Sequence, residues 1–385
     1  MFVLKLIIRN AFRHKLRSLL TVVGVAIAIL AFGMLRTLVG LWYYGAENAS
    51  ATRLVTRNAI SLVFSLPLAY RERIRQVPGV QQVSYGNWFG GIYRDEKQFF
   101  ANYAVEPKSY LGLYPELLLS AEQKNSFILD RKGCIVGRKL ADLHGWRLGD
   151  TITLKGTIFP GQWEFVLRGI YLGAEKATEE RVLLFHWDYL NETLKKTVPR
   201  RADQAGFYMI GVTRPELAAE VSATIDSIFR NSIAETLTET EKAFHLSFVS
   251  MTEAIMIAIQ AVSYVVIVII MVVAANTMAM TARERIAEYA TMKTLGFGAG
   301  HIAGVVFGES MVIAITGGVA GIILTYPVAS WIENELVQYF PAFPVSTETI
   351  ILDLLAAAAV GAVAGIFPTW RGSTIRIADG LRRIG

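Results

Sequence analysis

A charged segment between two long apolar runs carries the residues most suited to chemistry. It reads Thr281-Ala-Arg-Glu-Arg-Ile-Ala-Glu-Tyr-Ala-Thr-Met-Lys293-Thr-Leu-Gly-Phe-Gly298. Arg285 and Glu288 are three residues apart, a spacing that brings opposite charges together on one face of a helix. We expect Gly296 and Gly298 to end that helix. This chemistry is the ion pairing of a segment held by another protein, rather than the conversion of a substrate.

A second candidate is Glu309, which lies inside the apolar run that follows the charged segment. A carboxylate at membrane depth is costly unless it is paired, protonated or turned towards protein. Glu309 therefore either takes part in a proton or substrate relay, or packs as a buried carboxylate that bonds a neighbouring helix. We expect no second acid or histidine at membrane depth, which favours the packing role.

Motifs for catalysis and for metal or nucleotide binding are absent from the sequence. The nearest approach to a phosphate-binding loop, Gly133-Cys-Ile-Val-Gly-Arg138, has the wrong length and ending. The five histidines are scattered and form no metal-binding motif. No Gly-x-Ser-x-Gly sequence marks a hydrolase. We therefore expect a chain that is not an enzyme and that binds no metal or cofactor of its own.

The segments that hold these residues are long and apolar. Of the 385 residues, 53% are hydrophobic, and they concentrate in four runs. Each run is about as long as the roughly 20 residues that cross a bilayer. The first is too long for the apolar core of a signal peptide, so we expect it to stay uncleaved. We predict membrane spans at residues 18–44, 254–280, 301–328 and 350–368.

Charge placement predicts the orientation of the spans. Residues 1–17, 281–298 and 369–385 hold 12 basic and three acidic residues, whereas the loop 329–349 holds three glutamates and no basic residue. By the positive-inside rule, both termini and the segment 281–298 are cytoplasmic, and residues 45–250 lie outside. The outside stretch has a net charge of only +2, which gives no support for nucleic-acid binding.

The first 17 residues carry basic side chains at intervals of four, opposite an apolar face. This pattern predicts an amphipathic helix over residues 1–17 on the inner membrane surface. A plain basic flank that only sets the topology remains the alternative.

Residues 45–250 are numerous enough for one sizeable domain, and their apolar residues show helical spacing in some stretches and strand-like alternation in others. We predict helices at 68–76, 138–143 and 215–230, and strands at 82–85, 127–136, 151–154, 165–171, 182–185 and 207–212. These indicate an α+β domain, which the lone Cys134 cannot cross-link internally. Residues 231–253 are predicted to be a helical stalk, either continuous with the second span or separated from it by a short hinge.

Small residues recur at intervals of four in the last two spans. They indicate close helix packing inside the bundle or across a dimer, although glycine is also common in membrane helices. The packing candidates are Gly317, Gly318, Gly321, Gly361 and Gly365, together with Glu309.

The layout and several motifs resemble permeases of the MacB, LolC/LolE and FtsX type. Arg285-Ile-Ala-Glu288 and Lys293-Thr-Leu-Gly296 match the segment that follows the second span in that family, and Glu309 with Gly317-Gly318-Val-Ala-Gly321 matches its third span. Pro368, Arg371 and Leu381-Arg382 match the end of its fourth span. The outside motifs are Val77-Pro-Gly-Val80, Val136-Gly-Arg-Lys-Leu-Ala141 and Gly149-Asp150.

The resemblance implies a permease, in the inner membrane, that a separate ABC ATPase drives by mechanotransmission, with ATP and Mg bound by that partner. It implies a homodimer or a pseudo-dimer with a related permease, contacts with membrane lipids, and a periplasmic adaptor or carrier protein. The cargo would be amphipathic: a lipid, lipoprotein, peptide or drug. The residues that would couple this chain to the ATPase are Arg283, Glu284, Arg285, Glu288, Met292, Lys293 and Gly296.

A second hypothesis is a signalling or scaffold protein of the FtsX kind that regulates a cell-envelope hydrolase and moves no cargo. A neighbouring gene for an adaptor or lipoprotein carrier would favour transport, and one for a hydrolase would favour signalling. Against the resemblance stand two departures: no fused nucleotide-binding domain, and an outside domain larger than is usual for FtsX.

Overall fold

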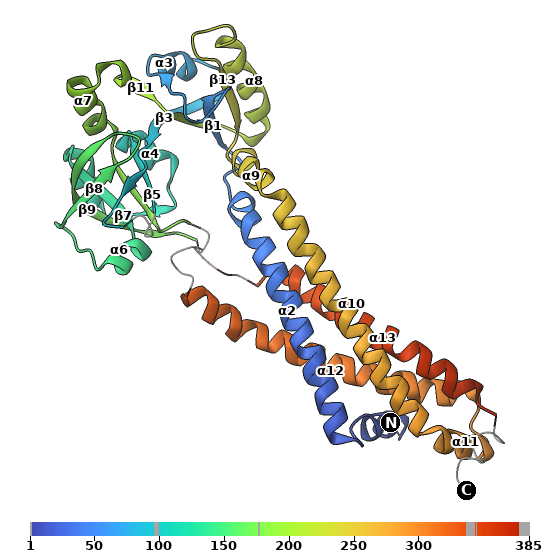
Figure 1. The fold of residues 1–385 in the computed structure, drawn as a ribbon. Coiled ribbons are helices and arrows are strands. Elements are labelled where there is room, and N and C mark those ends of the chain that lie inside the picture. The colour runs from blue at the N-terminus through green and yellow to red at the C-terminus, as the bar shows by residue number, and fades with distance from the viewer. Residues whose placement is uncertain (1, 96–99, 176–177, 336–342, 344, 377–385) are drawn as a thin grey trace. The chain divides into compact units, whose positions relative to one another are not determined.

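The computed structural model describes residues 2–95, 100–175, 178–335, 343 and 345–376 (Figure 1). They form two compact units. The described residues of 2–42 and 252–376 make the first, which we call the helical unit, and those of 43–251 make the second, the sheet unit. The predicted tail motif Leu381-Arg382 and most of the predicted loop 329–349 lie outside the described residues.

The helical unit is built from long apolar helices. Four of them are long and apolar enough to cross a membrane, and each contains one of the predicted spans. The class predicted from the sequence, a four-span helical membrane protein with an α+β domain inserted after the first span, is therefore confirmed. The helices are α1 (Phe2–Ala11), α2 (Lys15–Glu47), α10 (Glu253–Glu284), α11 (Ile286–Thr294), α12 (Ala299–Glu335) and α13 (Thr347–Thr374).

The N-terminal helix is shorter than predicted. Instead of one helix over residues 1–17, α1 ends at Ala11 and α2 begins at Lys15, with a bend between them. The Ser18 hydroxyl donates a hydrogen bond to the Ala11 carbonyl, which the broken helix leaves free, at 2.5 Å. We call residues 12–14 and the turns on either side the elbow.

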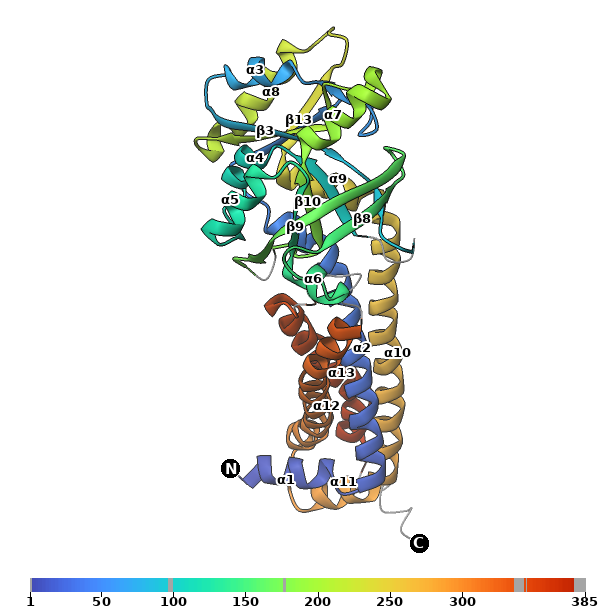
Figure 2. The ribbon, with the colours of Figure 1, turned by 90° about the vertical axis from the view of Figure 1, so that its left-hand side faces the viewer.

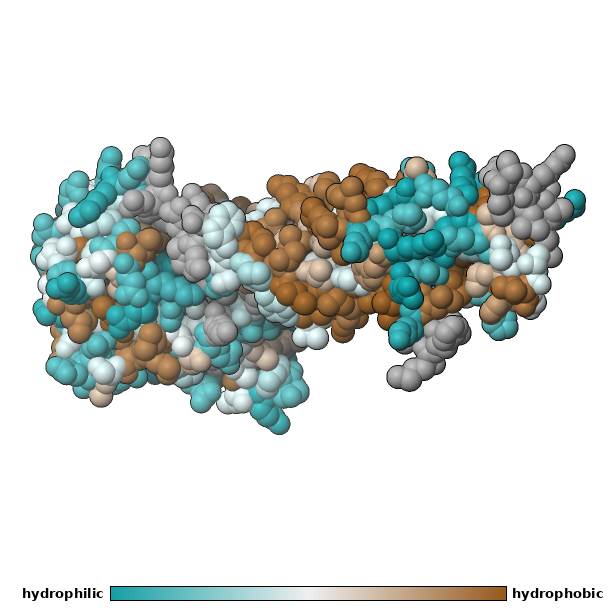
Figure 3. Space-filling view, turned by 90° about the horizontal axis from the view of Figure 1, so that it is seen from below, coloured by the Kyte–Doolittle hydropathy of each residue, from teal (hydrophilic) through white to brown (hydrophobic). Residues whose placement is uncertain are grey.

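Helices α10, α12 and α13 lie side by side in the helical unit, and a buried apolar cluster joins them to α2 (Figure 2). The outer surfaces of these helices remain apolar (Figure 3). On α10, for example, Val265, Ile269 and Val272 are each more than half exposed. Exposed apolar surface of this extent suits contact with lipid chains rather than water.

The sheet unit is organised around one mixed sheet. Its strand order is β13-β1-β12-β3-β5-β10-β7-β9-β8-β4, with β6 paired to β9, and β11 and β2 form a separate pair. Parallel pairing occurs between β10 and β5 and between β7 and β9. The strand that follows α2, β1, lies next to β13, the strand that precedes α9, so the two ends of this unit are hydrogen-bonded neighbours.

The strands occupy β1 (Arg53–Asn58), β2 (Leu66–Pro67), β3 (Val80–Trp88), β4 (Gly91–Ile92), β5 (Ala101–Val105), β6 (Leu117–Leu118), β7 (Gly133–Gly137), β8 (Thr151–Gly156), β9 (Gly161–Gly173), β10 (Val182–His186), β11 (Gln204–Ala205), β12 (Phe207–Val212) and β13 (Thr236–Thr240). The helices are α3 (Tyr70–Arg75), α4 (Pro107–Leu113), α5 (Ala121–Leu129), α6 (Arg138–His144), α7 (Trp187–Thr197), α8 (Ala218–Ile228) and α9 (Glu241–Met251). Short 3₁₀ turns occupy Pro199–Arg201 and Pro215–Leu217.

Two predictions in this unit are wrong in part. The predicted strand 127–136 begins too early, because the Ser120 side chain caps α5, which runs through Phe127 to Leu129. The predicted helical stalk 231–253 contains strand β13 before α9, since its alternating threonines favour a strand. Helix α9 ends at Met251 and α10 begins at Glu253, so the chain leaves regular helix at Thr252.

The core of the sheet unit is aromatic. The fully buried ring of Phe89 packs edge-on against Trp163 and Phe185, with centroid distances of 5.3 and 5.1 Å. Cys134 is also fully buried, and burial raises the pKa of its thiol. The only cysteine in the sequence is therefore held unreactive in the folded protein.

Candidate functional site

The segment between α10 and α12 contains a helix that ends where the sequence predicts. Helix α11 stops at Thr294, and Gly296 adopts a left-handed conformation with φ of 93°. The Phe297 amide donates to the Met292 carbonyl and the Gly296 amide to the Lys293 carbonyl, both at 3.1 Å. These two bonds define a Schellman cap, which requires glycine at the left-handed position.

The start of the segment differs from the prediction of a single helix. Helix α10 ends at Glu284, and Arg285 leaves helical geometry with φ of −100° and ψ of 13°. Helix α11 then begins at Ile286. The break sits at the residue whose side chain enters the interior of the helical unit.

Arg285 forms a buried ion pair with Glu309 of α12. The Nη1 group of Arg285 donates to Glu309 Oε2 at 2.6 Å, and its Nε donates to Glu288 Oε2 at 3.0 Å. Arg285 and Glu309 are only 5% and 6% exposed. Of the two roles left open for Glu309, this geometry favours the structural one, a carboxylate that bonds a neighbouring segment.

The expectation that no second acid lies at membrane depth is wrong. Asp353 lies in α13, within the fourth predicted span, and is 1% exposed. Neither of its carboxylate oxygens has a hydrogen-bond partner among the described residues. The carboxylate fits against α2 because Gly33 has no side chain there: a Cβ at that position would lie 2.6 Å from Asp353 Oδ2.

Two arginines of the N-terminal region complete the network around the segment. Arg13 Nη1 donates to Glu288 Oε1 at 2.7 Å, and the Arg17 guanidinium binds both carboxylate oxygens of Glu284, at 2.6 and 2.9 Å. Each exposed pair alone contributes about 0–1 kcal/mol. Glu288 also pairs with Arg285, so a continuous chain of ion pairs runs from Arg13 in the elbow to Glu309 in α12, whereas Arg17 and Glu284 pair separately.

The charges of this network fix the ionisation of Glu288. Partial burial would raise its pKa, but the hydrogen bonds and positive charge of Arg285 and Arg13 outweigh burial and hold the pKa below its usual value. Beside it, Tyr289 is 1% exposed, and burial raises the pKa of its phenol to about 12. Glu288 therefore stays charged and Tyr289 neutral at neutral pH.

Lys293 ties the far end of α11 to α13. Its Nζ donates to the carbonyls of Ser373 and Ile375, at 2.8 and 2.7 Å. These carbonyls lie at the end of α13, where backbone acceptors lack helical partners and where a cation is favoured. Helix α11 is thus linked to α12 through Arg285, the residue directly before it, and to α13 through its own Lys293.

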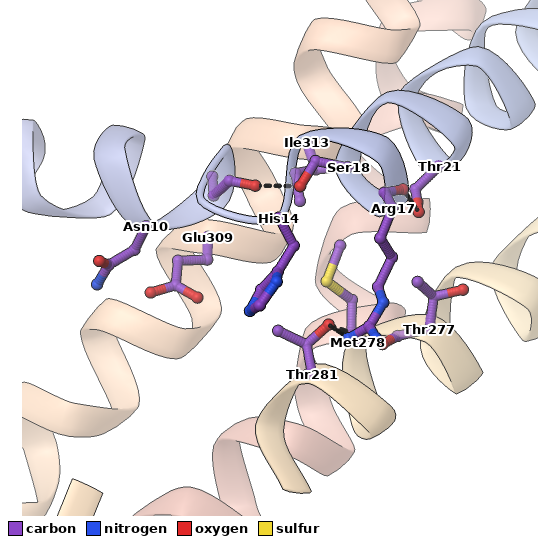
Figure 4. Close-up of a pocket in the computed structure, with 11 residues that line it drawn as sticks. Asn10, His14, Arg17, Ser18, Thr21, Thr277, Met278, Thr281, Glu309 and Ile313 are labelled. Carbon is purple, nitrogen blue, oxygen red and sulfur yellow. Dashed lines mark hydrogen bonds between the residues drawn. The ribbon is translucent and has the colours of Figure 1, made fainter. Parts of the chain in front are cut away.

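A small cavity lies where the elbow meets α10 and α12 (Figure 4). Asn10, His14, Thr281 and Glu309 are among the residues that line it. Its volume is about 20 Å³, enough for one water molecule with several polar partners. Within the described residues no group of three or more histidine, cysteine or acidic side chains could hold a metal ion.

Two large apolar side chains are exposed at the end of the segment. Leu295 is 73% exposed and Phe297 43% exposed, and both follow α11 directly. We call residues 291–301 the tip. Seven residues were predicted to contact a partner. Of these, Glu284, Arg285, Glu288 and Lys293 form bonds within the chain, Met292 is partly buried, and Arg283 and Gly296 are exposed. Leu295 and Phe297 were not among the residues predicted from the sequence to contact a partner. Their apolar character in a short polar loop was the signal that could have identified them.

The five candidate packing glycines all lie at contacts between helices of this chain. A Cβ on Gly317 or Gly321 would meet backbone carbonyls of α2, at 2.8 and 2.7 Å. A Cβ on Gly318 would collide with Ala357, and one on Gly361 would lie 2.9 Å from Ala314. Gly365 packs against Phe307 and Ser310. The glycines therefore allow α12 to approach both α2 and α13 closely.

The sheet unit has its own buried ion cluster where the chain enters and leaves it. Arg53 on β1 donates to Glu241 at 2.8 Å, to the Leu113 carbonyl at 3.0 Å, and pairs with Glu116 at 2.7 Å. Its guanidinium lies 4.2 Å from the centroid of the Tyr114 ring, and Tyr114 donates to Glu241. Since Glu241 is the first residue of α9, this cluster joins the first strand of the unit to its last helix.

Comparison with known proteins gives the class. Residues 261–377 match the family described as FtsX-like permease C-terminal. An uncharacterized ABC transporter permease of Methanocaldococcus jannaschii is 24% identical, and the alignment covers 97% of this chain and 96% of that protein.

Two solved structures resemble parts of the chain at low scores. The periplasmic region of MacB from Actinobacillus actinomycetemcomitans is 9% identical and covers 51% of this chain and 92% of its own, with a TM-score of 0.36. The extracellular domain of the transporter YknZ from Gram-positive bacteria is 11% identical and covers 49% and 100%, with a TM-score of 0.35. At such low scores these likenesses do not define the fold of the sheet unit, which rests on its own strand order.

Four apolar helices, an ion-paired segment between the second and third, and the family match define a multi-pass membrane protein of the permease class. Its residues 261–377 resemble the FtsX-like permease family, and the chain over nearly its full length is similar to an ABC transporter permease.

Proposed function

We propose that this chain is the permease subunit of an ABC transporter and that a separate ATPase subunit binds at the tip. The observation that carries the proposal is the exposure of Leu295 and Phe297 directly after a helix that Arg285 at its start and Lys293 near its end anchor in the helical unit. Apolar anchors on a rigid base are typical of protein interfaces. ATP and Mg would be bound by the partner, and this chain would supply no cofactor.

The tip then lies in the cytoplasm. The basic residues of α1, the elbow and the segment 281–298 support this orientation, by the positive-inside rule. Both termini would be cytoplasmic, the sheet unit would lie outside, and the membrane would be the inner membrane of the cell.

The network around α11 supports a mechanical role. A displacement of α11 by the ATPase would pull on α12 through Arg285, on α13 through Lys293, and on the elbow through Arg13. Buried, close-packed contacts move as blocks rather than deform. In the sheet unit, the Arg53 cluster holds the two connections to the helical unit together, so motion of either span would reach the whole sheet.

The moved cargo would be amphipathic, and a dimer of this chain, or of this chain with a related permease, would provide two tips for two ATPase subunits. An adaptor or carrier outside the membrane would receive the cargo. The resemblance to the permease family supports these proposals.

The proposal is tested with Leu295→Ala and Phe297→Ala together. The full chain and the ABC ATPase co-expressed with it are purified through a tag on the chain, and the rate of ATP hydrolysis is measured in liposomes. We expect the double variant to lose most of the bound ATPase, because its apolar anchors are gone. The control is Ile233→Ala, which removes an exposed apolar side chain from the sheet unit. Full retention of the ATPase by the double variant would contradict the proposal.

A further inference from the structure

A groove opens on the helical unit between the elbow and α10. Its volume is about 670 Å³, against about 20 Å³ for the neighbouring cavity of Figure 4. Its walls include His14, Lys15, Leu16, Leu20, Val273 and Thr277. Residues of the elbow and of α2 line one side, and residues of α10 line the other.

The body of the groove is apolar. Leu16 and Leu20 are one helical turn apart and therefore lie on the same face of α2. They are 72% and 63% exposed, and Val273 on the facing helix is 52% exposed. These side chains form a strip that suits a hydrocarbon chain running parallel to the helices.

One end of the groove is basic. Lys15 and His14 lie there, and neither side chain makes a hydrogen bond to any residue that the structure describes. Arg17 lies beside them but is held by both oxygens of Glu284. Arg13 is likewise neutralised by Glu288, so Lys15 contributes positive charge that no acidic residue of the segment compensates.

The basic surplus extends along α1. Lys5 and Arg9 add two exposed positive charges, and the first 17 residues contain no acidic residue. A basic cluster beside the inner end of a membrane helix attracts anionic lipid, at about 1 kcal/mol for a basic residue close to the headgroup and less for one further away. An apolar strip alone would accept any lipid, whereas a strip that ends beside the unpaired Lys15 selects a negative headgroup.

We propose that this groove binds one anionic phospholipid. Its phosphate contacts Lys15 and His14, and an acyl chain lies along Leu16, Leu20 and Val273. A free phosphate ion would leave the apolar strip uncovered, and a second copy of the chain would place its own basic elbow against like charge. This site is independent of the ATPase partner, because the tip contributes no residue to it.

The test uses the full chain in micelles that contain equal amounts of phosphatidylglycerol and phosphatidylcholine, with bound lipid counted by native mass spectrometry. Lys15→Gln should reduce the retained phosphatidylglycerol about five-fold, the loss expected for one basic contact. Lys5→Gln removes one positive charge from an exposed position outside the groove. It should change the amount of retained phosphatidylglycerol by less than about two-fold. Equal losses in both variants would overturn the site in favour of general surface attraction.

A second pair of variants tests the apolar strip. Leu20→Trp fills the groove and should displace both lipids, whereas Leu19→Trp, on a side chain that does not line the groove, should displace neither. Retention of phosphatidylglycerol by Leu20→Trp would overturn the proposal. Complete displacement of phosphatidylglycerol by inorganic phosphate would also overturn it, because the groove would then be an ion site. Disulfide-linked dimers of a Lys15→Cys variant would overturn it as well, because a second copy of the chain would then cover the groove.

Discussion

Replacing Arg285 by methionine should destabilise the helical unit severely. The substitution removes the cation that Glu309 binds at 2.6 Å and leaves its carboxylate 6% exposed and without charge compensation. Breaking a buried pair from one side costs about 3–5 kcal/mol. The equilibrium constant for unfolding should therefore rise by about two to four orders of magnitude.

Removing both charges should restore most of that loss. In the double variant Arg285→Met with Glu309→Leu, apolar side chains of similar size replace the pair, and such replacements cost little or even stabilise. We expect the double variant to lie within about 1 kcal/mol of the original chain. The coupling energy between the two positions, from the full double-mutant cycle, should then be about 3 kcal/mol or more.

The assay is equilibrium unfolding of the full chain in mixed micelles, with each variant measured under identical conditions. Arg283→Met is the matched control, because Arg283 is exposed two residues before Arg285, and its loss should cost about 0.5 kcal/mol or less. The account of this site fails if Arg285→Met is no more harmful than Arg283→Met, or if the double variant is as unstable as the single one.

Three further variants probe other contacts. Gly318→Ala should lower the free energy of unfolding by about 1–3 kcal/mol, because the new methyl group meets Ala357, and adding Ala357→Gly should restore it. Gly304→Ala is the control, because open space surrounds Gly304. An equal loss in the control would contradict the close packing at Gly318. Arg53→Met should lower the unfolding free energy of the sheet unit by about 3–5 kcal/mol, and a loss below about 1 kcal/mol would show that the cluster is not buried. Burial and the nearby positive charge of an arginine lower the pKa of His144 in the folded protein. The sheet unit should therefore lose stability as the pH falls below about 6.5, where the unfolded chain binds the proton more readily. His144→Phe should remove that pH dependence when unfolding is followed by tryptophan fluorescence.

Local patterns in the sequence were sufficient for much of this structure. The length of the apolar runs predicts the four spanning helices, since a bilayer sets a minimum length. The position of Gly296 predicts the end of α11, because only glycine suits the left-handed cap. Spacing also identified the packing glycines, although it left open whether they pack within the chain or between chains.

Contacts between distant segments could not be predicted in the same way. Arg13 and Glu288 are 275 residues apart, and neither has a neighbour in the sequence that marks it as a partner. Arg285 carries the same local pattern as an exposed residue, yet the break in the helix turns it inwards to Glu309. Asp353 is a different case, because an acid within a predicted span is visible in the sequence and its hydropathy signal was simply outweighed by its neighbours.

The location of the ATPase tests the central claim most directly. A photoreactive amino acid is placed at Leu295, or at Ile233 in the sheet unit as the control, since both side chains are highly exposed. The chain is co-expressed with its ABC ATPase in intact cells and illuminated, and cross-linked products are identified by mass. The account predicts a cross-link to the ATPase from Leu295 and none from Ile233. A cross-link to the ATPase from Ile233 alone would contradict this account. So would labelling of position 295 by a membrane-impermeant reagent added outside the cell.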